Sequence, residues 1–280
     1  MSGREIPYYR DYISDALLER LLKEARPVAG VPGLTEVGTG GGLENQHAFS
    51  FLCRLYEAMK DELNTVLNQR QTDRAFFDQR VRACFELNRS LKIPFTDPRY
   101  ETVLGHEDGN GRIVAGPLND FYCRPGGGAP IAPLPEYLKG PHVTLFGPPD
   151  DAKLSINAMN AFHRKLIDEP PIVGTILENN PPTPKWGADD EDSKTPLRKD
   201  LVAAGVNLTA SIRGDLSFKD EASGKSYQLE NENRSVPIKR FPGLALPATF
   251  LFYNGNPIPL HLYDFALHLF ANASQEKGLS

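Results

Sequence analysis

The sequence predicts an α/β protein in which a mainly helical N-terminal region precedes a series of βα units. Two segments with apolar residues at helical spacing lie before residue 94, and short apolar strands alternate with helical segments after residue 141. The intervening stretch is rich in proline and glycine, a composition typical of an extended connector. We therefore expect three regions, which span residues 1–93, 94–141 and 142–280.

Composition narrows the class of protein. The chain has 280 residues, of which 40% are hydrophobic and 24% charged, proportions that are ordinary for a folded globular protein. A net charge of −5 argues against nucleic-acid binding, which normally requires a basic excess. No stretch approaches the ~20 apolar residues of a membrane span, and the N-terminus lacks the apolar run of a secretory signal. We expect an intracellular, cytoplasmic protein that binds neither nucleic acid nor a membrane.

Two helices are predicted in the N-terminal region. The first spans Asp11 to Glu24 and ends before Pro27, and the second carries an apolar stripe from Phe49 to Leu67. Residues 28–42 between them are interpreted as a glycine-rich loop. Because this loop lacks the Gly-Lys-Ser/Thr ending of a phosphate cradle and follows no apolar strand, it is not predicted to bind phosphate.

Alternating strands and helices in the C-terminal region predict a parallel sheet or a barrel, because each strand is followed by chain long enough for a crossover. Strands are predicted at residues 142–146, 171–177 and 235–239, helices at 152–165 and 260–273, a polar loop at 181–199, an inserted hairpin near 216–229, and an extended pair joined at Asn254-Gly255.

In a βα barrel, functional groups lie at the carboxyl ends of the strands and in the loops that follow. This rule selects Asp150, Asp151, Glu178, Asn179, Asn180, Lys239 and Arg240. A guanidinium and a carboxylate from neighbouring strand ends could bind a small oxo-acid, because the planar fork of arginine matches a carboxylate group. The alternative is that these charged groups only face solvent.

Two further patterns carry weaker predictions. His142-Val-Thr-Leu145 is similar to one half of a two-histidine phosphoesterase, but no other histidine is followed by X-Ser/Thr, so His142 is expected only to begin a strand. The acidic run Asp189-Asp-Glu-Asp192 is interpreted as a solvated loop, with cation binding as the alternative. The spacing of the histidines and the three scattered cysteines predict no zinc site and no disulfide framework.

Five segments resemble parts of malate synthases in the same order along the chain. Gly147-Pro-Pro-Asp-Asp-Ala-Lys-Leu-Ser-Ile-Asn-Ala-Met-Asn160 resembles the first βα unit of that family, with its Gly-Pro turn and Ile-Asn-Ala-Leu-Asn-type helix. The other four are similar to the second-strand segment, the inserted hairpin, the third helix and the N-terminal helical clasp, and they span residues 177–186, 212–229, 253–273 and 51–70.

The resemblance implies a partial (β/α) TIM-barrel-type unit behind a helical clasp. It also implies an acyltransferase that condenses acetyl-CoA with glyoxylate to give malate, with Mg²⁺ as cofactor. Arg240, in Lys239-Arg-Phe-Pro-Gly243, is the best match to the Arg-Pro-Arg-Gly motif of the family, whose arginine stabilises the carbonyl and the developing enolate. Glu178 matches a supporting carboxylate, whereas Ile176 and Asn179 replace aspartates of the family motif.

The length of the chain limits the activity that the resemblance implies. The metal ligands, the CoA pocket and the general base of the family follow the third βα unit, so no metal ligands are expected in this chain. The residues from His142 onward are fewer than the roughly 250 of an eight-unit barrel. We therefore expect a protein that is inactive alone or that depends on a second chain or an oligomer, because an open sheet edge needs a partner.

Two other functions are compatible with the sequence. The chain could be a non-catalytic relative of malate synthases that binds a small acid or a partner, or another barrel-type lyase or aldolase. Family members can carry a C-terminal peroxisomal tripeptide, which Gly278-Leu-Ser280 does not match.

Overall fold

The computed structural model describes residues 8–91, 106–107, 113–114, 144–167, 185–191, 197–230 and 234–274. Two compact units form, one from Met1–Glu62 with Leu134–Ser280 and the other from Leu63–Pro133. In the second unit lie the latter part of helix α2 (Gln46–Leu91) and the antiparallel pair β3 (His106–Glu107) and β4 (Ile113–Val114). Most of the predicted connector lies outside the described residues. Helices combined with parallel and antiparallel sheets confirm the α/β class.

Both N-terminal helices are confirmed, although the first begins at Asp15 and not at Asp11 as predicted. The 3₁₀ turn η1 (Tyr8–Asp11) precedes α1 (Asp15–Glu24), which begins where Leu17 N donates to the Ser14 hydroxyl at 3.3 Å. Helix α2 begins at Gln46, directly after Asn45, whose Oδ1 accepts from Ala48 N at 3.0 Å. No helix in the described part of the chain is both long enough and apolar enough to cross a membrane.

The glycine-rich segment is more ordered than predicted. Residues 34–36, expected in a loop, form strand β2 (Leu34–Glu36), which lies between β1 (Arg26–Pro27) and β10 (Pro247–Tyr253). The loop prediction was wrong here because β2 takes its partner from the other end of the chain, with Glu36 opposite Leu251. β10 continues into β11 (Asn256–Pro259) through Asn254-Gly255, whose φ values of 50° and 79° fit a tight hairpin turn.

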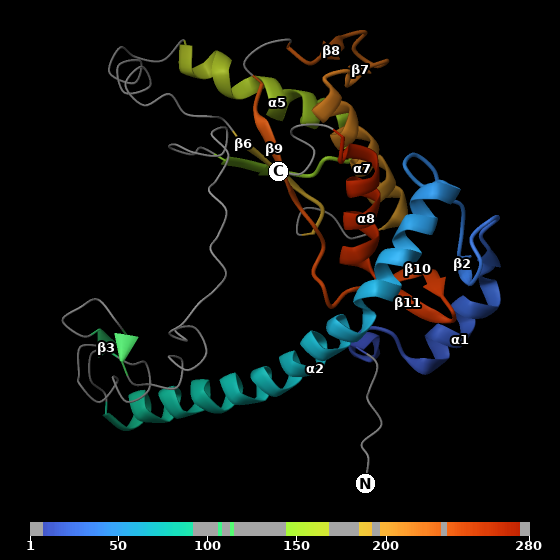
Figure 1. Cartoon of the computed structure of the whole chain (residues 1–280). Helices are drawn as coiled ribbons and strands as arrows, with labels where there is room; N and C mark the ends of the chain where they lie inside the picture. Colours follow the sequence, from blue (N-terminus) through green and yellow to red (C-terminus); the bar gives the residue numbers. More distant parts are fainter. Residues whose placement is uncertain are drawn as a thin grey trace. The chain divides into compact units, whose positions relative to one another are not determined.

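A three-stranded parallel sheet forms the centre of the C-terminal region. Its order is β5 (Thr144–Gly147), β6 (Lys185–Asp189) and β9 (Val236–Arg240). Helix α5 (Ala152–Ile167) follows β5, α7 (Arg198–Arg213) follows β6, and α8 (Leu260–Asn272) follows β11 (Figure 1). The buried side chains between this sheet and its helices are Ile156, Ala158, Met159, Trp186, Ala188, Leu208, Leu216 and Leu229.

The prediction of a polar loop at residues 181–199 was wrong over the described part of this range. Residues 185–189 are the central strand of the sheet, and α7, which was not predicted, begins at Arg198. The segment Lys185-Trp-Gly-Ala-Asp189 lacks β-branched residues, so local propensity did not reveal it, whereas parallel pairing on both of its edges holds it extended. The predicted strand at 171–177 lies outside the described residues.

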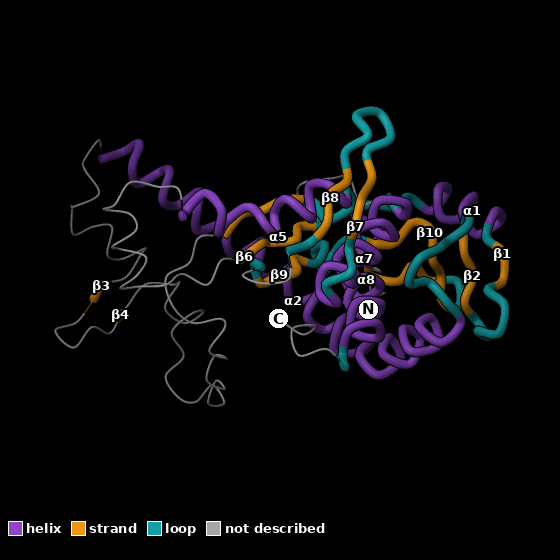
Figure 2. The backbone as a smooth tube through the Cα atoms, turned by 90° about the horizontal axis from the view of Figure 1, so that it is seen from above, coloured by secondary structure: helices purple, strands orange, loops and turns teal. Residues whose placement is uncertain are grey.

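The inserted hairpin is confirmed as β7 (Ser217–Lys219) and β8 (Ser226–Gln228), with Phe218 opposite Tyr227. Figure 2 shows it extending away from the body of the helices. Lys153 of α5 lies 5.0 Å from the centre of the Tyr227 ring, a cation–π contact at the base of the hairpin.

Candidate functional site

The candidate site lies at the carboxyl ends of β6 and β9. The two strands are parallel and in register, which places Asp189 directly beside Arg240. Arg240 Nη1 lies 3.3 Å from Asp189 Oδ2, and Nη2 lies 3.5 Å from Glu191 Oε1. The Asp189 side chain is 6% exposed and the Arg240 side chain 42% exposed. One edge of the sheet therefore presents a guanidinium that is anchored by carboxylates and still reaches solvent.

A second ion cluster lies on the other face of β9. Successive side chains of a strand point to opposite faces, so Lys239 points away from Arg240. The Lys239 ammonium forms an ion pair with Asp190 Oδ2 and lies 2.9 Å from Asp264 Oδ1. Asp190 follows β6 and Asp264 belongs to α8, so three elements contribute to the cluster. All three side chains are at most 5% exposed.

One ammonium balances two carboxylates in this cluster. Burial raises the pKa of Asp190 to about 7, against the opposing effect of the Lys239 charge and with a further contribution from the Asp264 charge. Burial disfavours the charged form of Lys239, but Asp264 and Asp190 together raise its pKa above the usual 10.5. The ammonium thus stays charged, while Asp190 binds a proton more readily than an ordinary carboxyl group.

Arg198 anchors the glycine-rich segment to the same body. Its Nε lies 3.0 Å from Glu44 Oε1, its Nη1 donates to Val37 O at 3.0 Å, and its Nη2 pairs with Glu36. Tyr263, next to Asp264 on α8, donates to Glu44 Oε1 at 2.6 Å. Glu44 in turn accepts from Gly41 N at 2.8 Å. This loop is therefore held by charged hydrogen bonds to α7 and α8.

Of the predicted residues, the structure brings Arg240 to a carboxylate and directs Lys239 into the interior. Asp151 has a structural role, because its Oδ1 accepts from Leu154 N at 2.9 Å at the start of α5. The main-chain oxygen of Asp150 accepts from Asn207 at 2.9 Å. Glu178, Asn179, Asn180 and His142 lie outside the described residues.

Sequence reasoning missed three acidic residues. The run at 189–192 was interpreted as a solvated loop, which was wrong for Asp189 and Asp190, because both are buried and pair with Arg240 and Lys239. Asp264 was not singled out. The sequence did contain a signal for it, because Asp264 is the only acidic residue in the apolar helix at 260–272. A single carboxylate in an apolar helix indicates a buried ion-pair partner.

The described residues do not fit a magnesium site. Among them, no group of three or more His, Cys, Asp or Glu side chains could hold a metal ion. Asp190 and Asp264 contact the Lys239 ammonium, and Asp189 and Glu191 contact Arg240. These four carboxylates are thus already paired with cations of the chain itself.

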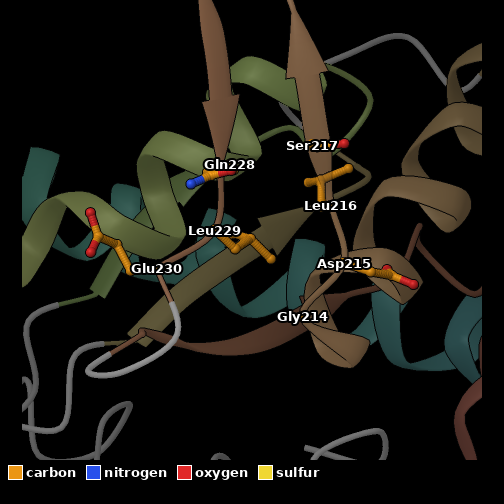
Figure 3. Close-up of a pocket in the computed structure, with 7 residues that line it drawn as sticks. All are labelled: Gly214, Asp215, Leu216, Ser217, Gln228, Leu229 and Glu230. Carbon is orange, nitrogen blue, oxygen red and sulfur yellow. The ribbon is translucent and has the colours of Figure 1, made fainter.

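A separate pocket of about 520 Å³ lies at the base of the β7–β8 hairpin. Figure 3 shows Leu216 and Leu229 close together across it, with Asp215 and Glu230 directed to opposite sides. Both leucines belong to the buried core of the sheet and its helices. Because the two carboxylates do not converge on a common point, we assign no binding role to this pocket.

No family model matches the chain. Malate synthase from Myxococcus xanthus (strain DK1622) is 33% identical over 146 residues, which is 52% of this chain and 23% of that protein. Malate synthase A from Escherichia coli (strain K12) is 33% identical over 142 residues, 51% of this chain and 22% of that protein. A bifunctional glyoxylate cycle protein from Caenorhabditis elegans is 26% identical over 212 residues, 76% of this chain and 17% of that protein. The matches span less than a quarter of each relative and confirm the resemblance found in the sequence.

Proposed function

We propose that this chain, a divergent relative of the malate synthases, is a malate synthase-like acyltransferase. In the proposed reaction, a Claisen-type condensation joins the methyl carbon of acetyl-CoA to the aldehyde carbon of glyoxylate, and water then hydrolyses the thioester, which releases malate and the free CoA thiol. The observation that carries the proposal is the similarity to malate synthases over about half of the chain. The position of Arg240 at the carboxyl end of a parallel strand supports it, because such strand ends hold the active sites of barrel enzymes.

Arg240 is proposed to bind glyoxylate and to stabilise the negative charge that develops on its carbonyl oxygen. Its guanidinium carries five N–H donors in a planar fork, and the partly exposed side chain keeps part of that fork accessible. Its ion pairs with Asp189 and Glu191 hold the fork in one orientation, which reduces the entropy lost on binding. Glu178 is proposed as a supporting carboxylate, on the resemblance alone.

We also propose that β5, β6 and β9 belong to a (β/α) barrel. Two features support this: the strands are parallel, and their order in the sheet follows their order in the chain. Within the described part of the chain, β5 and β9 are the sheet edges, and a second chain or an oligomer is proposed to cover them. Solution mass by light scattering tests this point, and a monomer at high concentration would contradict it.

No step of the proposed reaction passes through magnesium. The resemblance suggested Mg²⁺, but the described carboxylates that lie closest to Arg240 are ion-paired with it. What the described residues supply is orientation and charge stabilisation at the carbonyl oxygen. The base that removes the proton from acetyl-CoA is assigned to none of them.

A thiol-release assay tests the proposal directly. The purified 280-residue chain is incubated with acetyl-CoA and glyoxylate, with and without Mg²⁺, and the freed CoA thiol is measured. Arg240→Ala is expected to lower kcat/KM by about 100-fold, the usual cost of losing an oxyanion donor. Arg213→Ala, at the exposed end of α7, is the matched control and should leave the rate unchanged. No thiol release under any condition would overturn the proposal for this chain alone.

One observation favours a second candidate, a non-catalytic protein that binds a small oxo-acid. Arg240 already pairs with two carboxylates, which partly balance its positive charge. This balance reduces its electrostatic stabilisation of an oxyanion more than it reduces its capacity to donate hydrogen bonds. Calorimetry with glyoxylate separates the two candidates. Binding that Arg240→Ala abolishes, without any thiol release, would support the binding protein over the enzyme.

A further inference from the structure

We propose that Lys239 is a built-in cation, whose ammonium occupies the position between Asp190 and Asp264 at which a divalent metal ion would otherwise bind. The inference goes beyond the acyltransferase proposal and does not rest on it. It concerns only the buried carboxylate pair behind the sheet, and every measurement below is made without acetyl-CoA or glyoxylate.

Geometry is the first support. Asp190 follows β6, Asp264 lies on α8, and Lys239 lies on β9 between them. The ammonium pairs with Asp190 Oδ2 and lies 2.9 Å from Asp264 Oδ1, so oxygens from two separate carboxylates converge on one point. Proteins commonly bind Mg²⁺ through one or two carboxylates, with water completing the shell. The pair is therefore arranged as ligands for a single cation.

An unpartnered oxygen is the second, independent support. Asp264 Oδ2 is buried without a hydrogen-bond partner, and the residue is only 4% exposed. Buried carboxylate oxygens normally have partners, because leaving one unpaired is costly. The cluster thus holds more acceptor capacity than its single ammonium fills. That excess is expected of a site whose ligands suit an ion of higher charge and coordination number.

The covalent attachment of Lys239 to β9 explains why its ammonium, and not a metal ion, occupies this point. Lys239 is delivered to the carboxylates by its own strand, so its ammonium has a high effective concentration at this point. Mg²⁺ must shed tightly held water before it can bind two carboxylates in a closed space. Removal of the ammonium should therefore uncover a divalent-cation site that the parent chain does not display.

Thermal unfolding of the full chain tests this inference, with about 10 mM MgCl₂ or MnCl₂ as the probe at about pH 8, where proton competition for the carboxylates is weak. In Lys239→Met, each metal is expected to raise the unfolding midpoint by about 3 °C. The parent chain and Lys199→Met, a control at an exposed lysine, should show no rise. The double variant Lys239→Met/Asp190→Asn should show none either, because one carboxylate of the pair is gone.

Two outcomes would overturn the inference. One is a metal-induced rise in the parent chain that Asp190→Asn removes, since the ion would then already bind there. The other is a folded Lys239→Met chain with no metal response.

If Lys239→Met does not fold, ¹⁵N-lysine NMR of the parent chain decides. A buried ammonium in slow hydrogen exchange, identified by its loss in Lys239→Arg and unchanged by Mg²⁺, supports the inference. The lack of such a signal, or its displacement by Mg²⁺, contradicts it.

Discussion

Arg240 and Asp189 end two neighbouring parallel strands at the same level, and Nη1 of the one lies 3.3 Å from Oδ2 of the other. Their chain neighbours, Lys239 and Asp190, form a second ion pair on the opposite face of β9. The adjacent residues Asp189 and Asp190 thus pair with the adjacent residues Arg240 and Lys239, and the two ion pairs lie in different surroundings. The first reaches solvent and the second is enclosed, so the two should differ sharply in their effect on stability.

Lys239→Met is expected to lower the free energy of unfolding by about 3–5 kcal/mol, because it leaves buried carboxylates without their cation. Arg240→Ala should cost about 1 kcal/mol or less, because water screens this partly exposed pair. Urea unfolding of both variants measures the difference. Equal losses would show that the cluster around Lys239 is not enclosed as described.

Stability should fall with rising pH because of Asp190. Its pKa is raised from 3.8 in the unfolded chain to about 7 in the folded one, so between these values the folded state holds a proton that the unfolded state has released. The free energy of unfolding therefore declines as pH rises through this window, by up to about 1.4 kcal/mol per unit, and levels off above it. Lys239, whose pKa is raised above 10.5, contributes no slope in this range.

The comparison of the parent chain with Asp190→Asn isolates this effect. Asparagine resembles the protonated side chain and does not titrate, so the variant should lose the part of the pH slope that Asp190 supplies. Urea unfolding from about pH 4 to pH 8 provides the measurement. Identical slopes for the two proteins would refute the assignment to Asp190.

Arg198→Met should destabilise the chain by about 3 kcal/mol and loosen the glycine-rich segment. The guanidinium bonds Glu36, Glu44 and the main chain of Val37, and its loss leaves Glu44 with only its remaining partners, among them Tyr263. Urea unfolding gives the stability, and amide hydrogen exchange at residues 37–45 reports local opening. Arg213→Met is the control, because Arg213 is exposed. Unchanged exchange in that segment would contradict the anchoring role.

Gly187→Ala should cost about 1–3 kcal/mol, because a Cβ at that position would lie 2.4 Å from Phe146 Cδ1. The ring of Phe146 lies across the glycine on the neighbouring strand and is 63% exposed. Gly147→Ala is the matched control, since its Cβ would meet nothing nearer than Trp186 at 3.8 Å. Both are measured by urea unfolding.

A double-mutant cycle tests the cause of that cost. In a Phe146→Ala background, Gly187→Ala should cost less than half as much, because the ring that it displaces is absent. An undiminished cost would place the strain elsewhere in the sheet.

The sequence by itself determined the elements that depend on local signals. The two N-terminal helices follow from apolar spacing, helix α5 from the turn at residues 147–151 that precedes it, and the β10–β11 hairpin from Asn254-Gly255. The resemblance to malate synthases was likewise recognisable from short motifs in order. Each of these signals lies within about 20 residues, so no knowledge of distant partners was needed.

Only the tertiary structure decided what β6 and the residues after it do. Lys185 to Asp189 becomes a strand because β5 and β9, far away in the chain, pair with both of its edges. Asp190 and Asp264 become buried ion partners because β9 brings Lys239 between them. A charged side chain in water needs no partner, whereas a charged side chain in the interior is stable only when it is paired. Only the packed chain determines which partner it meets.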